Sequence, residues 1–541
     1  MREFKTHGFG PAALTPLGPE PLPVPRRTFG IGTDISFVPD IIQRVFPPAA
    51  IKILVVTDTL SFALGGFALG RFCAALEDHG GPEHPAYARF DVTKAATVSG
   101  ASADIQGFTF SDASLAGYDQ LWLFGFGGGP TGPDGWRVSS LEAGEVAAIE
   151  RFMDAGKGVF ATGDHEDLGL GLAAGIKRVR SMRRWYDTHG GAFPLPPGEI
   201  ETPDQNDLTR IDTREPVLPG APNSGSETDA EPQVIRPRYY NGPSIFRQYP
   251  HPVLCGPRGA IRVFPDHAHE GFCQVPSSPD AAEFPGPAPQ VIAWGDTVAG
   301  RTKGAYTLPN STPFGLLAAY DGHEAEVGRV VTDSTWHHWM DMNIDPMIAA
   351  HAADPAETAW LDVLAYFRNV AVWLSPKNKQ RAMRRAGTTI FAFAYPFIEE
   401  IQPSLAELHL ARPVPLATAA RDALGRVAPR CQHLVWFRDL LRETEMNRLA
   451  DILDPWGPKR PGFKMPDDQV AILAETTLYA ALGGAAVAVR EAAERGEDQK
   501  ALDEKGLDAA MAKHAGTAVR KALEELAERS ERTCEGIKSL L

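Results

Sequence analysis

The run Ile51-Lys52-Ile53-Leu54-Val55-Val56 is short, rich in β-branched residues and almost continuously apolar. Such a run is typical of a strand that is buried on both faces of a parallel sheet. Two similar runs follow at residues 119–126 and 158–162, and apolar residues at helical spacing over 141–155 separate them. Strands that alternate with helices predict a mostly parallel, doubly wound α/β sheet with right-handed crossovers.

The same pattern continues along the chain to about residue 375. Additional strands are predicted at residues 87–97, 260–264, 290–294, 314–320 and 328–332, and helices at 66–79 and 360–373. Residues 190–235 are rich in Pro, Gly, Asp and Asn, which predicts a long loop with a functional role or high mobility.

Length and composition predict three parts. A chain of 541 residues is too long for one ordinary core. Residues 1–48 are rich in Pro and Gly and predict an extended arm, and residues 49–375 form the α/β domain. Residues 376–541 predict an all-helical domain, through which copies of the chain could form a homo-oligomer, with helices at 416–428, 434–453, 468–495 and 507–540.

The charge and the cysteines restrict the partners and the compartment. The net charge of −15 argues against a nucleic-acid partner, because phosphate binding needs a basic surface. No apolar run approaches the roughly 20 residues that span a bilayer, and the N-terminus lacks the pattern of a signal peptide, so we expect no membrane partner. The five cysteines are widely spaced without a CxxC pair, which predicts no disulfide, no cysteine zinc site and a cytoplasmic protein.

Five of the fifteen histidines fall in three short clusters that also contain acids, and each cluster follows a predicted strand. The clusters are Gly163-Asp164-His165-Glu166-Asp167, Asp266-His267-Ala268-His269-Glu270, and Asp333-Ser334-Thr335-Trp336-His337-His338. Because parallel strands end at one edge of a sheet, where ligands bind, these side chains predict a site for metal binding or acid/base chemistry.

The metal interpretation assigns each residue a role. Some of His165, His267, His269, His337 and Asp164 supply nitrogen and oxygen ligands to a divalent ion, Zn²⁺ before Mn²⁺ or Fe²⁺. Glu270, Asp266 or Glu166 acts as the general base on a small polar substrate. Arg178, His338 and Trp336 contact that substrate.

Each motif also has a simpler interpretation. The acids at 164–167 suit a helix N-terminus, and residues 266–270 suit a solvated turn. Of His337 and His338, one faces the site on a strand and the other packs in the core. The basic stretch 177–185 binds an anionic group or forms a solvated helix face, and Gly127-Gly128-Gly129 either presents N–H groups to an anion or forms a tight turn. The histidines and carboxylates could also move protons without a metal.

The order of these elements resembles the class I glutamine amidotransferase-like superfamily, and within it the ThuA-like branch, over residues of about 50–375. Gly163-Asp164-His165 stands where that branch has Gly-Ile-His and true amidotransferases have Gly-x-Cys. His251-Pro252 matches the branch's His-Pro, and Gly328-Arg329-Val330 leads to a histidine as in the branch. The resemblance implies an amidotransferase-like (flavodoxin-like) sheet.

Two features depart from that family pattern: the doubled His337-His338 and the segment Asp266–Glu270. The nucleophilic cysteine is missing from the turn, so glutamine hydrolysis is not expected. We therefore predict a metal-dependent hydrolase or lyase at the C-terminal ends of the parallel strands. The alternatives are a metal-free acid/base enzyme and a non-catalytic scaffold or binding subunit.

Overall fold

The computed structural model describes most of the α/β region and much of the helical region. The described residues are 47–80, 84–133, 137–164, 167–184, 232–241, 248–256, 258–265, 271–276, 280–296, 313–393, 417, 420, 424–425, 427–457, 467–494 and 504–540. The predicted N-terminal arm, up to residue 46, lies outside them, as do residues 190–231 of the predicted long loop.

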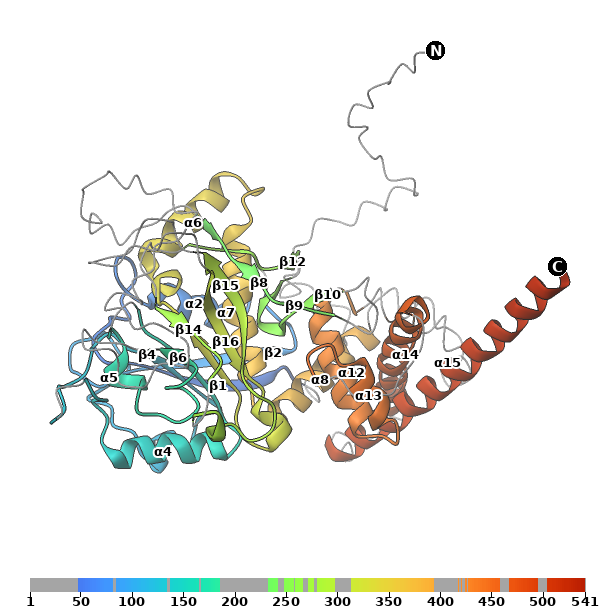
Figure 1. Ribbon diagram of the computed structural model, residues 1–541, viewed down its shortest axis with the longest axis horizontal. Helices are drawn as coiled ribbons and strands as arrows, with labels where there is room; N and C mark the ends of the chain where they lie inside the picture. Colours follow the sequence, from blue (N-terminus) through green and yellow to red (C-terminus); the bar gives the residue numbers. More distant parts are fainter. Residues whose placement is uncertain are drawn as a thin grey trace, which may run out of the picture.

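A twisted, mostly parallel sheet forms the centre of the α/β domain (Figure 1), as the sequence predicts. Its strand order is β3-β2-β1-β4-β5-β17-β16-β14-β6, and the strands from β3 to β17 run parallel. These six are β1 (Ala49–Thr57), β2 (Ala88–Ala96), β3 (Ile105–Gln106), β4 (Gln120–Phe124), β5 (Gly158–Thr162) and β17 (Val330–Asp333).

Antiparallel strands complete the sheet beyond β17. They are β16 (Pro313–Tyr320), β15 (Gln290–Asp296), β14 (Phe272–Cys273), β8 (Arg236–Pro237) and β6 (Arg183–Arg184). The sheet is therefore mixed, and the strand predicted at 314–320 runs antiparallel to its neighbours.

Helices cover both faces of the sheet, which explains the continuous apolar runs. Ile51, Ile53 and Val55 point toward α2 (Gly70–Glu77) and α7 (Ala359–Leu374). Leu54 and Val56 point toward α3 (Asp112–Leu115) and α4 (Ala143–Asp154). Another helix, α6 (Asp341–Ala353), follows the last parallel strand and contacts α2 and α7.

Within the described ranges, three two-stranded ribbons lie outside the main sheet. They pair β9 (Tyr239–Asn241) with β10 (Gln248–Pro250), β11 (Cys255–Gly256) with β12 (Gly259–Ala260), and β13 (Val263–Pro265) with β7 (Pro232–Val234). The prediction of one sheet strand at 260–264 is wrong, because this stretch is divided between two ribbons. β13 instead contacts α7 and the 3₁₀ turn His337–Trp339.

A helical region follows the sheet, as predicted, and lies to one side of it (Figure 1). Its described helices are α8 (Lys377–Ala392), α12 (Arg430–Arg442), α13 (Asn447–Leu453), α14 (Asp467–Glu494) and α15 (Glu504–Leu540). Most of the predicted helix at 416–428 lies outside the described residues. Helix α8 contacts both β1 and α14, so one continuous core joins the two regions. No helix in the described part of the chain combines the length and apolar composition that crossing a membrane requires.

The prediction that the cysteines form no disulfide is wrong for one pair. Cys255 of β11 and Cys431 of α12 are bonded, with Cα atoms 6.2 Å apart and 176 residues between them in sequence. The bond joins the α/β region to the helical region. The pairing could not be predicted from the sequence, because the two cysteines lie far apart along the chain and belong to no recognisable motif.

Candidate active site at the ends of the parallel strands

The ends of four parallel strands meet at one edge of the sheet. The register places Thr57 beside Phe124 and Phe124 beside Thr162, while Thr332 of β17 lies beside Ala161 of β5. The residues that follow these strands therefore gather at this edge. They include Asp58, the segment 125–129, Asp164 and the segment 334–338.

Asp164 and His337 form a buried pair at the junction of β5 and β17. His337 Nε2 donates to Oδ2 of Asp164 over 3.1 Å, and Thr335 Oγ1 donates to Oδ1 of Asp164 over 2.9 Å. The hydroxyl of Thr335 also accepts from the backbone N–H of His337, at 3.1 Å. Asp164 and His337 are each 1% exposed. The structure thus brings together two of the five predicted metal ligands, from the first and third clusters.

This geometry does not fit the alternative that Asp164 caps a helix. The next helix, α5 (Leu170–Ala173), has Gly169 at its N-cap. The carboxylate of Asp164 is bonded instead to side chains that lie more than 170 residues away in sequence.

The residues on either side of the second cluster lie next to the first and third clusters. Phe264, just before it, stacks on the ring of His338 with centroids 4.4 Å apart. Gly271, just after it, donates its N–H to the carbonyl of Ser334 over 3.2 Å. A Cβ at Gly271 would lie 3.0 Å from the carbonyl oxygen of Asp164. The residues that flank the second cluster therefore contact the first and third clusters.

Six predicted site residues lie outside the described residues. They are His165, Glu166, Asp266, His267, His269 and Glu270. Among the residues that the structure does describe, no three His, Cys, Asp or Glu side chains are arranged to hold a metal ion.

His338 belongs to a separate buried network. Its Nε2 donates to Oδ2 of Asp333 over 2.7 Å, and the same oxygen accepts from Tyr366 Oη at 2.8 Å and Trp339 Nε1 at 3.2 Å. His338 is fully buried within this network. His337 and His338 diverge as expected, but from a 3₁₀ turn and not from a strand.

Trp336 contacts residues 125–129, which we call the glycine segment. Its Nε1 donates to the carbonyl of Gly125 over 3.1 Å, and its ring contacts those of Phe67 and Phe126. The side chain is 1% exposed, so the structure places the predicted substrate contact Trp336 in a buried position beside His337.

Asp58 anchors the glycine segment. Its carboxylate accepts from the backbone N–H groups of Phe126 at 2.8 Å and Gly127 at 2.7 Å. The N–H of Gly127 therefore serves an internal anion, which favours the structural interpretation of the glycines at this position. Burial raises the pKa of Asp58, and these hydrogen bonds oppose that rise.

Arg183 is a buried cation at the strand ends that the sequence did not reveal. Its guanidinium donates to the carbonyls of Asp333 at 2.8 Å, Asp164 at 2.6 Å and Ser334 at 2.7 Å. Burial lowers the pKa of Arg183 to about 10, which still leaves it charged at neutral pH. The guanidinium holds the first and third clusters together.

The basic stretch 177–185 is neither a solvated helix face nor, at Arg178, part of this site. Arg178 is 4% exposed and pairs with Asp154 at 2.6 Å. Asp154 ends α4 just before β5 begins, so Arg178 lies at the opposite edge of the sheet. The predicted contact between Arg178 and a substrate at the site is therefore not supported by its position.

The described geometry adds Thr335, Asp333, Asp58 and Arg183 to the candidate site. Thr335 and Asp333 stand inside the third cluster, so their position was visible in the sequence, while Asp58 follows the first strand as the other cluster acids follow theirs. Comparisons with known proteins give no assignment: no family model matches this chain, and no curated protein does.

Proposed function

We propose that the chain is a hydrolase, or a lyase, that acts on a small polar substrate at this edge of the sheet. The observation that supports it is the buried contact between Asp164 and His337, which joins two of the three acid-and-histidine clusters. The contacts of Phe264 and Gly271 bring the flanks of the remaining cluster to the same place. Such a gathering of imidazole and carboxylate has no evident structural need in a sheet that is otherwise apolar.

A divalent metal ion fits this pair. Two ligands bound at ~2.0–2.1 Å to a tetrahedral ion lie ~3.3 Å apart, and Asp164 Oδ2 and His337 Nε2 are 3.1 Å apart. We propose that one of His165, His267 and His269 would supply a third ligand and leave the fourth position to water. When bound, such an ion makes a coordinated water more acidic and so supplies a hydroxide nucleophile.

The chain's own residues then orient and neutralise the site. Thr335 holds one oxygen of Asp164 and the backbone of His337, which sets the direction of both side chains. Arg183 supplies a positive charge beneath them. Glu166, Asp266 and Glu270 are the proposed proton acceptors, each in a segment whose flanks reach the site.

The same hydrogen bond favours a second candidate, an acid/base enzyme that needs no metal. A carboxylate bonded to one imidazole nitrogen fixes the ring and its tautomer and makes the other nitrogen a better base. In this case His337 moves the proton and Asp164 orients it.

Metal analysis of untagged protein, with two buried histidines compared, tests the proposal. We expect about one equivalent of Zn²⁺, Mn²⁺ or Fe²⁺ in the wild-type chain, with occupancy lost in His337→Ala. His433→Ala is the control, because His433 is also buried but lies in α12, where its ring bonds to the carbonyl of Leu424. Equal loss of metal in both variants would refute the ligand assignment.

Absence of metal from wild-type protein, together with unchanged thermal stability in chelator, would reject the metal ion. A screen of ester, amide and lactone hydrolysis then distinguishes the second candidate. If neither metal nor turnover that depends on His337 is found, the enzyme proposal fails and a scaffold remains.

A further inference from the structure

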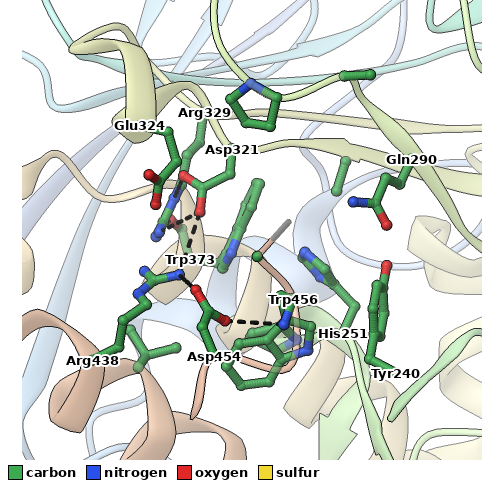
Figure 2. Close-up of a pocket in the computed structure, with 16 residues that line it drawn as sticks. Tyr240, His251, Gln290, Asp321, Glu324, Arg329, Trp373, Arg438, Asp454 and Trp456 are labelled. Atoms are coloured by element: carbon green, nitrogen blue, oxygen red, sulfur yellow. Dashed lines mark hydrogen bonds and ion pairs between the residues drawn. The ribbon is translucent and has the colours of Figure 1, made fainter. Parts of the chain in front are cut away.

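A polar cavity lies at the opposite edge of the sheet from the candidate site, where the α/β region meets the helical region (Figure 2). Asp321 follows β16 and Arg329 precedes β17, and both line it. Arg438 of α12 and Asp454 line it from the helical side. The space open to the centre of a water molecule is about 50 Å³.

One side of the cavity is a closed network of charges. Arg329 donates to both oxygens of Asp321, at 2.8 and 3.1 Å, and Arg438 Nη1 contacts Asp454 at 3.3 Å and Asp321 at 3.7 Å. With Glu324, the lining has three carboxylates against two guanidinium groups, a difference of one negative charge. An anionic ligand in this space would therefore meet net electrostatic repulsion.

The other side of the cavity presents the polar side chains of Tyr240, His251 and Gln290. The hydroxyl of Tyr240 is buried and has no hydrogen-bond partner among the described residues. His251 Nδ1 accepts from the N–H of Val253 at 3.3 Å, so the neutral ring carries its proton on Nε2. Burial lowers the pKa of His251 to about 3, which keeps the ring neutral at physiological pH. Figure 2 shows the Gln290 amide above the Tyr240 hydroxyl.

Tyr240 and His251 are both buried, so a missing hydrogen bond at the Tyr240 hydroxyl carries a free-energy cost. Tyr240 is 9% exposed and His251 7%. A buried polar group without a partner costs about 1–3 kcal/mol, so its retention argues for a ligand or ordered water. Trp373 and Trp456 supply flat apolar walls, and Trp373 lies edge-on to His251 with centroids 4.9 Å apart.

Size and chemistry limit the ligand. A buried water needs ~10–15 Å³ of such space, so the cavity accommodates about four non-hydrogen atoms. Two N–H or O–H donors suit a carbonyl oxygen, and a carboxamide at Gln290 both donates and accepts. We propose that this cavity binds a small uncharged primary amide, with its carbonyl oxygen toward Tyr240 and His251 and its amide group toward Gln290.

The matched pair acetamide and acetate tests this proposal in the full chain, because the two have the same shape and differ in charge. We expect saturable binding of acetamide in ligand-detected NMR, with a dissociation constant on the order of millimolar, and much weaker binding of acetate. Tyr240→Phe should weaken acetamide binding about three- to tenfold, the loss of one hydrogen bond.

Tyr239→Phe is the control variant, because its hydroxyl accepts from Arg262 at the exposed surface and not in the cavity. Circular dichroism melts establish that both variants fold. The proposal is overturned if acetamide does not saturate, if acetate binds as tightly, or if Tyr239→Phe weakens binding as much as Tyr240→Phe. The cavity lies at the opposite edge of the sheet from the strand-end site, so failure of this proposal leaves the proposed hydrolase untouched.

Discussion

Asp333 Oδ2 accepts a 2.7 Å hydrogen bond from His338, and this pair is fully buried at the end of β17. Trp339 and Tyr366 donate to the same oxygen, so three donors hold one carboxylate. The network ties the last parallel strand to α7 and thereby positions the adjacent His337.

Removing one donor tests the importance of this network. Tyr366→Phe should lower the free energy of unfolding by about 1.5–3 kcal/mol, the usual contribution of a hydrogen bond to a charged group. Urea denaturation measures the change. Tyr118→Phe is the control, because no described residue bonds to that half-buried hydroxyl, and its cost should stay within ~0.5 kcal/mol. Equal effects in both variants would contradict the assigned role of Asp333.

The environment of Asp341 leads us to expect that the stability of the fold depends on pH. Burial raises its pKa from 3.8 to about 6, and the N–H groups of Gly65 and Arg71 oppose that rise. The folded chain therefore binds this proton more tightly than the unfolded chain, so the contribution of Asp341 is most favourable at low pH. It declines as pH rises from about 4 to 6 and then levels off.

Asp341→Asn removes this titration. The unfolding free energy of the wild type minus that of the variant should fall by about 1–3 kcal/mol as the pH rises from 3.5 to 7. Denaturant titrations at several pH values measure it. A difference that favours the wild type as pH rises would show that the pKa of Asp341 is not raised.

The sequence predicted the parallel part of the sheet because the evidence is local. The strand at 51–56 is almost continuously apolar, since helices cover both of its faces, and the first and third acid-and-histidine clusters follow strands whose ends coincide. Antiparallel pairing of β16 was not predicted, because a short apolar run carries no direction.

Long-range contacts explain why Arg183 was not predicted as a residue of the candidate site. Arg183 belongs to a basic stretch that resembles a solvated surface, yet its carbonyl partners come from Asp164 and from residues 150 positions away. Nothing local distinguishes this buried arginine from the exposed Lys177 nearby. The pair Asp164 and His337, by contrast, was predicted to meet because each stands in a cluster at a strand end.

Close packing at the glycine segment predicts a steric effect at the candidate site. A Cβ at Gly125 would lie 2.7 Å from both the Cα and the carbonyl oxygen of Gly169. Backbone cannot yield as a flexible side chain does, so Gly125→Ala should destabilise the fold by about 1–3 kcal/mol and displace the carbonyl that Trp336 binds. Gly117→Ala is the control, with nothing within 4 Å of its Cβ. Thermal melts and tryptophan fluorescence should change in the first variant and not in the second.

The disulfide between Cys255 and Cys431 predicts both a thiol count and a change in stability. Three cysteines are free, so protein denatured without reductant should react at three thiols and reduced protein at five. Five thiols without reductant would show that the bond does not form. The bond closes a loop of 176 residues, and a cross-link over a long loop restricts the unfolded chain strongly.

Removing both sulfurs in Cys255→Ala with Cys431→Ala should therefore lower the free energy of unfolding by about 2–5 kcal/mol. Cys534→Ser is the control, because Cys534 is exposed and free, and its melt should match the wild type. Reductant should lower the melting temperature of the wild type toward that of the double variant and leave the double variant unchanged. Since the bond joins the α/β and helical regions beside the cavity lined by Tyr240 and His251, its loss should also weaken acetamide binding there.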